Sequence, residues 1–101
     1  YVREQKWLTL SDAIARLSLL PARRMADFAP AFARKGRIQV GADADLVIFD
    51  PKTVAARATY LEPFLAPTGI HSVVVAGRVS VQHGQIVKSA GIGTKITRLT
   101  P

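Results

Sequence analysis

The catalytic chemistry open to this chain is limited first by its histidines, because there are only two, His71 and His83. His71 is expected to begin a strand, and His83 lies beside a turn glycine. A catalytic zinc ion usually takes three protein ligands and keeps one position open. Two histidines at the ends of separate strands do not supply that set, so we expect both to be structural or surface residues.

Three aspartates are the next candidates, because closely spaced carboxylates can bind calcium or act as general acid and base. Asp43 and Asp45 lack the later acidic ligands of a calcium loop, and Asp50 stands at the far end of an apolar run. The spacing therefore predicts local hydrogen bonds in a turn for Asp43 and Asp45. Asp50 is expected to cap the turn that begins at Pro51.

Neither the serines nor the late glycines form a recognisable catalytic motif. No serine lies in the G-x-S-x-G turn of a nucleophile elbow, and these residues are Ser11, Ser18, Ser72, Ser80 and Ser89. Gly91 and Gly93 make half of a dinucleotide-binding fingerprint, but no helix is predicted after them. From the residues alone we predict no catalytic, metal-binding or cofactor-binding site in this chain.

The first third of the chain has a helical pattern. Thr9 precedes an apolar stripe and Asp12 stands three residues later, which predicts a capped helix that begins at about Leu10. Pro21 suits the first turn of a second helix, predicted over residues 21–28. Pro30 ends it, and residues 29–34 are expected to form a loop.

The remainder is predicted to be a small, mostly antiparallel sheet, so the fold class is α+β. Residues 38–40 alternate as in a half-buried strand, and residues 46–49 are apolar on both faces, as in a central strand covered on both sides. Residues 70–88 contain two short turns, which predicts a three-stranded meander. The aromatic side chains are expected to fill the core or a face meant for a partner, and these are Trp7, Phe28, Phe32, Phe49, Tyr60 and Phe64.

Composition limits the classes of protein to which this chain can belong. The 101 residues suffice for one small domain, and 14 Lys and Arg against 7 Asp and Glu give a net charge of +7. The cations form no run longer than two, unlike a phosphate-tracking surface, so we expect no nucleic-acid partner. No cysteine, no apolar run of membrane-spanning length and a polar N-terminal segment lead us to expect a cytoplasmic protein without a membrane partner.

Five segments together resemble the C-terminal end of the amidohydrolase superfamily, and the resemblance covers nearly the whole chain, from about Tyr1 to Ile92. Residues 17–23 and the glycine-punctuated residues 35–51 occur throughout that superfamily. Residues 53–63, 67–70 and 73–79 follow in an order that is similar to N-acyl-D-amino-acid deacylases, the D-aminoacylase branch. One departure is Ala76-Gly77, where Asn-Gly is the common turn.

The resemblance implies a parent enzyme in which a (β/α)₈ barrel holds zinc and a β-sandwich is assembled from both ends of the chain. Residues 1–35 would be the last barrel helices, and residues 36–101 the C-terminal half of the sandwich. In such a parent, a metal-activated water attacks the amide of an N-acyl amino acid. The family's histidines, its bridging ligand and its catalytic aspartate match no position here, so the resemblance implies an inactive piece without its own cofactor.

The expected partners are therefore the missing barrel and sandwich strands of the parent. An exposed sheet edge also makes a homodimer possible. Two alternatives stay open at this stage. The first alternative is an independent binding or regulatory module. The second, suggested only by the net charge, is a nucleic-acid-binding domain.

Overall fold

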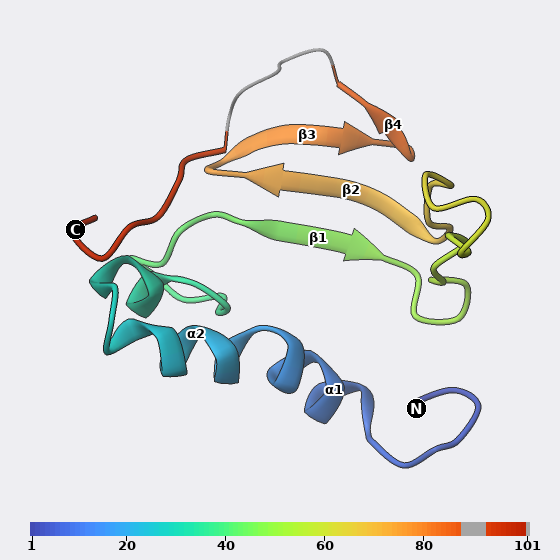
Figure 1. The fold of residues 1–101 in the computed structure, drawn as a ribbon, viewed down its shortest axis with the longest axis horizontal. Coiled ribbons are helices and arrows are strands. Elements are labelled where there is room, and N and C mark those ends of the chain that lie inside the picture. The colour runs from blue at the N-terminus through green and yellow to red at the C-terminus, as the bar shows by residue number, and fades with distance from the viewer. Residues whose placement is uncertain (88–92, 101) are drawn as a thin grey trace. The chain divides into compact units, whose positions relative to one another are not determined.

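The computed structural model describes residues 1–87 and 93–100. Their contacts divide the chain into two compact units, Tyr1–Ala44 with the tail Thr94–Pro101, and Asp45–Gly93. All helices among the described residues belong to the first unit and all strands to the second (Figure 1). The predicted α+β class, with two short helices followed by a small antiparallel sheet, is thus confirmed.

The first unit begins with helix α1, Leu10–Leu17, whose start was predicted correctly. The Thr9 hydroxyl oxygen accepts a hydrogen bond from the Asp12 backbone N–H at 3.1 Å and donates one to the Asp12 carboxylate at 2.8 Å. This arrangement satisfies one of the free N–H groups at the helix start and places a negative charge there.

Helix α2, Leu19–Ala26, follows after a single residue, so the two helices form one bent rod. The Ser18 hydroxyl donates to the Ile14 carbonyl at 2.6 Å, a contact that bends helices, and Pro21 has no N–H to continue the ladder. The predicted limits of residues 21–28 were therefore two residues late at both ends. Pro21 is still accommodated because it lies in the first turn, where N–H groups lack helical acceptors.

Residues 30–34, expected to be loop, instead form the 3₁₀-helix η1, Pro30–Arg34. Pro30 opens it, the Phe32 N–H donates to Ala29 and the Lys35 N–H donates to Phe32, so the tighter helical bonds satisfy the backbone after the proline. Gly36 then takes a φ of 70°, and a Cβ there would lie 2.5 Å from the Ser18 carbonyl oxygen. Only glycine fits this close approach to the helical bend.

The second unit is a four-stranded antiparallel sheet in the order β1-β2-β3-β4. Its strands are β1 Leu46–Phe49, β2 Ile70–Val75, β3 Arg78–Gln82 and β4 Gln85–Ile86. Both tight turns, Ala76-Gly77 and His83-Gly84, have two residues at positive φ, as two-residue hairpins with right-handed twist require. The predicted meander is confirmed as far as Ile86, while its predicted end at Lys88 and the tail's start lie outside the described residues.

Two strand predictions were wrong. Residues 38–40 are not a strand: the Ala42 N–H donates to the Gln39 carbonyl in a turn, and Ile38 and Val40 are 92% and 102% exposed. No other segment among residues 1–87 and 93–100 supplies the ladder partner that a strand needs. Strand β1 exists, but it is an edge strand, with Val47 53% exposed.

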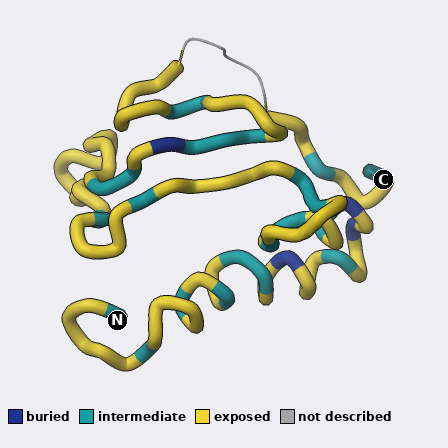
Figure 2. Tube along the Cα trace, turned by 180° about the vertical axis from the view of Figure 1, so that it is seen from behind, coloured by how far each residue is buried: buried dark blue, intermediate teal, exposed yellow. Residues whose placement is uncertain are grey.

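Very little of the described chain is buried (Figure 2). The buried residues are small: Ala22, Ala29, Ala31 and Ser72. Large apolar side chains remain at the surface of both units. The described residues thus form regular helices and strands but bury no large side chain.

Candidate functional site

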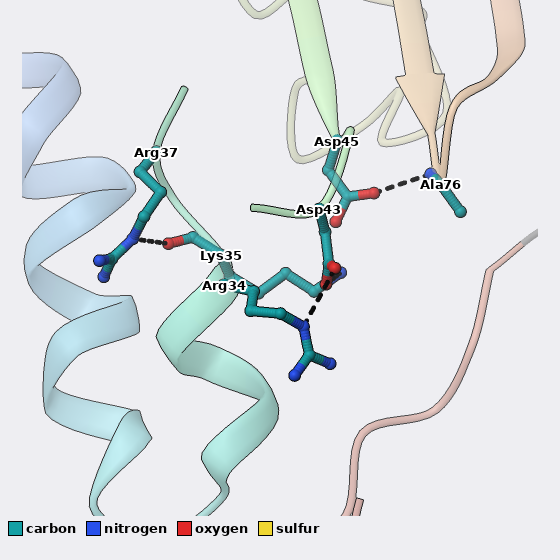
Figure 3. Close-up of polar contacts among 6 residues, drawn as sticks. All are labelled: Arg34, Lys35, Arg37, Asp43, Asp45 and Ala76. Atoms are coloured by element: carbon teal, nitrogen blue, oxygen red, sulfur yellow. Dashed lines mark hydrogen bonds and ion pairs between the residues drawn. The ribbon is translucent and has the colours of Figure 1, made fainter. Parts of the chain in front are cut away.

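Asp43 is held by two cations at the end of η1 (Figure 3). Its carboxylate lies 3.0 Å from Lys35 Nζ and 3.3 Å from Arg34 Nε, and its backbone N–H donates to the Arg34 carbonyl at 3.0 Å. The hydrogen bond from Lys35, with help from Arg34 and against the opposing effect of burial, lowers the pKa of Asp43 below its ordinary value. An acid of lowered pKa is ionised near neutral pH, so Asp43 is a structural carboxylate and not a proton donor.

Asp45 and Asp50 each stabilise a turn of the second unit. The Asp45 carboxylate accepts a hydrogen bond from the Ala76 N–H at 2.8 Å, in the turn between β2 and β3. The Asp50 carboxylate accepts one from the Lys52 N–H at 2.8 Å. The predicted cap by Asp50 is confirmed. The carboxylates of Asp43 and Asp45 also bind groups eight or more residues away, contacts that the predicted local turn bonds did not include.

The two histidines, predicted to lie on separate strand ends, are in contact. Their ring centroids are 4.6 Å apart, with the planes at 76°. The Gly84 N–H donates to the His71 carbonyl at 3.2 Å, which fixes the β3–β4 turn beside the start of β2 (Figure 1). Both imidazoles are exposed, in agreement with the expected surface position.

A register shift explains why sequence reasoning missed this pair. Val75 pairs with Arg78 and Val74 with Val79, so an unbroken hairpin would place residue 71 opposite residue 82. The ladder instead shifts by one residue between Val73 and Val74, and Ser72 pairs with Gln82. The next position, His71, then faces His83. The sequence contains no glycine in β3 or other signal of this bulge.

Ser72 lies next to this pair and is one of the few buried residues, at 7% exposure. Its Oγ is 2.6 Å from His71 Nδ1, a distance that a nucleophile and its base would also have. A substrate cannot reach a hydroxyl with so little exposed surface. The contact therefore orients the imidazole.

The described residues do not fit a catalytic zinc. Within residues 1–87 and 93–100, no three histidine, cysteine, aspartate or glutamate side chains are grouped closely enough to hold a metal. Asp43, Asp45 and Asp50 use their carboxylates in the contacts above, and the histidines give two ligands. A hydrolytic site with three protein ligands cannot be assembled from this part of the chain.

Most of the aromatic side chains that were predicted to fill a core or a face meant for a partner lie at the surface. Tyr60 and Phe64 are 99% and 98% exposed, and Trp7 stacks on Tyr1 with ring centroids 5.4 Å apart. Phe32 and Phe49 are half-buried.

In the part of the chain that the structure describes, no helix is long and apolar enough to span a membrane.

One known protein family and several known proteins are similar in sequence to this chain. The sequence profile of the amidohydrolase family matches residues 1–81. An N-acyl-D-glutamate deacylase of Alcaligenes xylosoxydans xylosoxydans is 48% identical over 77 residues, which is 76% of this chain and 15% of that protein. No solved structure matches the chain with comparable significance.

Two further relatives come from the same organism. A D-aminoacylase is 40% identical over 77 residues, 76% of this chain and 15% of its own length. An N-acyl-D-aspartate deacylase is 39% identical over 77 residues, 76% of this chain and 14% of its own length. The chain thus spans about one seventh of the length of the curated relatives that it matches.

Proposed function

The chain belongs to the amidohydrolase family, and from that premise we propose that it is the C-terminal structural part of a zinc-dependent hydrolase of N-acyl D-amino acids. The observation that carries the proposal is the 39–48% identity to three proteins whose names describe the removal of an acyl group from D-amino acids. Because the match covers only 14–15% of each relative, the activity is assigned to the whole protein. The role of this chain is to complete the scaffold.

The surface of both units supports a scaffold role. In the first unit, Ile14 and Leu17 on α1 are 43% and 83% exposed. In the second, Val47 and Ile48 on β1 are 53% and 56% exposed, although a strand that is apolar on both faces is typical of a covered sheet. We assign residues 1–35 to the last helices of a barrel and residues 36–101 to half of a sandwich, whose remaining parts cover these side chains.

The reaction proposed for the whole enzyme adds water across the amide C–N bond. It releases the acyl group as a carboxylic acid and the D-amino acid with a free amine. Zinc and its ligands belong, in this proposal, to the part of the enzyme that precedes Tyr1. No step of the reaction is assigned to a residue of this chain.

An activity assay tests whether the catalytic activity belongs to the whole enzyme and not to this chain alone. We expect the isolated chain not to hydrolyse N-acetyl-D-glutamate or N-acetyl-D-aspartate, with or without added zinc. The full-length protein of the same gene should hydrolyse at least one of them and lose this activity when residues 36–101 are deleted. Hydrolysis by the isolated chain at a rate similar to that of the full-length protein would overturn the scaffold role.

The coding sequence upstream of Tyr1 provides an independent test. We expect it to encode a His-x-His pair after an early strand, as the superfamily's metal site requires. An upstream sequence without such a pair would exclude the proposed hydrolase, whatever the assay of the isolated chain gives.

A further inference from the structure

We propose that His71 and His83 form a two-histidine binding site for a divalent transition metal on the sheet of the second unit. The proposal rests on the contact between the two rings and is independent of the proposed hydrolase. It goes beyond the sequence prediction, which placed the histidines apart and assigned no metal to the chain. The site is not a catalytic zinc site of the three-ligand type.

The spacing of the rings suits chelation. A metal about 2.0–2.1 Å from an imidazole nitrogen lies roughly 3.2 Å from the ring centre, so two imidazoles at 90° around it have centres about 4.5 Å apart, and at the tetrahedral angle about 5.2 Å. The observed separation of His71 and His83 is 4.6 Å. Both side chains are exposed, so an ion can reach the pair, and the His83 ring can turn toward it without a change of backbone.

The backbone holds the two residues in place. His83 lies in a turn with a φ of 51°, and the hydrogen bond from the Gly84 N–H to the His71 carbonyl ties this turn to β2. The pairing of Ser72 with Gln82 fixes the residue after His71 opposite the residue before His83. Because the strands are already in register, metal binding need order only two side chains.

Ser72 also prepares one ligand. In the tautomer that carries its proton on Nδ1, His71 donates to the buried Ser72 oxygen at 2.6 Å and keeps the Nε2 lone pair for a metal. Histidines that bind metals commonly donate their other N–H to such a partner, which fixes the tautomer and the direction of the ring. Ser72 is thus a positioning residue for the site.

The chemistry of two imidazoles selects the class of ion. Imidazole nitrogen suits Cu²⁺, Ni²⁺ and Zn²⁺, and affinity rises along the first-row metals to Cu²⁺. Mg²⁺ and Ca²⁺ prefer oxygen ligands, which this pair does not provide. With two protein ligands, the other coordination positions are left to water or to a small molecule.

The first experiment needs no variant. Cu²⁺ added to the chain in equal amount should give an electron paramagnetic resonance spectrum with hyperfine structure from two imidazole nitrogens on one copper. Coordination by a single imidazole would overturn the proposal. Ca²⁺ at the same concentration should not compete with copper.

The second experiment titrates Ni²⁺ calorimetrically into variants. His71→Gln and His83→Asn should each weaken binding about tenfold or more, because the second ligand of a chelate binds with a high effective concentration. Asparagine tolerates the positive φ at position 83, so the turn is kept. Ser72→Ala should weaken Ni²⁺ binding about tenfold while both histidines remain.

A matched control keeps two histidines but separates them. In the variant His83→Asn with Gln82→His, the new side chain sits one position earlier and points to the opposite face of the sheet. It should bind Ni²⁺ no better than His83→Asn alone. Recovery of the original affinity in this variant, or histidine single variants that bind Ni²⁺ as tightly as the original chain, would show that the facing pair is not the site.

Discussion

At the scale of single residues, three aspartates with the same chemistry have different roles because the fold brings each a different donor. Asp43 meets the side chains of Lys35 and Arg34, Asp45 meets the N–H of Ala76, and Asp50 caps its own turn. The sequence was sufficient only for Asp50, because its donor lies two residues away. The other donors are set by chain reversals that residue spacing does not reveal.

The Asp43 ion pairs should make stability depend on pH. Because the pKa of Asp43 is lowered in the folded chain, its contribution is complete above the unfolded value of about 3.9 and is lost as the pH falls through the folded value. Asp43→Asn should therefore lower the free energy of unfolding by about 1 kcal/mol or less at pH 7, since the pair is partly exposed. The difference from the original chain should vanish near pH 2 in urea unfolding.

A matched control is Glu62→Gln, which also removes one carboxylate. Glu62 is exposed, and its side chain makes no ion pair with any residue that the structure describes. Its replacement should leave stability nearly unchanged at either pH. An Asp43→Asn chain as stable as the original at pH 7 and low salt would contradict the assigned ion pairs.

At the scale of elements, local signals predicted the first helix and the hairpin turns, but they missed the 3₁₀-helix η1. The Thr9 cap located α1, and the two glycine turns located the hairpins. Residues 38–40 alternate correctly but form no strand, because a strand also needs a partner that the described chain does not supply. The contact between the histidines was hidden for a related reason, since it depends on a bulge in the pairing of β2 with β3.

The turn after η1 should be sensitive to one added methyl group. Gly36→Ala would place a carbon 2.5 Å from the Ser18 carbonyl oxygen, and it would also force alanine to a φ of 70°. Gly41→Ala meets only the second problem, because Gly41 has a φ of 88° and nothing within 4 Å of the new carbon.

We expect Gly41→Ala to cost about 1–2 kcal/mol, and Gly36→Ala about 1–3 kcal/mol more. Urea unfolding followed by helical circular dichroism measures both costs, since the described helices all lie in this unit. Equal losses in the two variants would show that residue 36 does not approach the bend between α1 and α2.

At the scale of the whole molecule, the exposed apolar side chains are the dominant feature. Ile38, Val40, Tyr60, Leu61 and Phe64 are all more than 85% exposed. Soluble monomers rarely leave large contiguous apolar patches in water, and an apolar edge strand is a template for further pairing. The edge strand β1 carries no charged side chain between Asp45 and Asp50.

The isolated chain should therefore associate with itself as its concentration rises. Its net charge of +7 opposes this, so added salt should strengthen association by screening the repulsion between copies. Light scattering over a range of concentrations and salt measures both effects. A monomer at every concentration and salt tested would contradict the prediction.

Two variants of equal charge distinguish pairing at the sheet edge from non-specific association through exposed apolar surfaces. Val47→Lys places a cation on edge strand β1, whereas Val81→Lys places one on β3 at a residue that is paired on both sides, with Val73 and with Ile86. Both variants add the same repulsion between copies, but only the first adds a charge to an unpaired edge. Val47→Lys should therefore reduce association more. An equal reduction by both variants would assign the association to exposed apolar faces, and the β1 edge would then have no role in it.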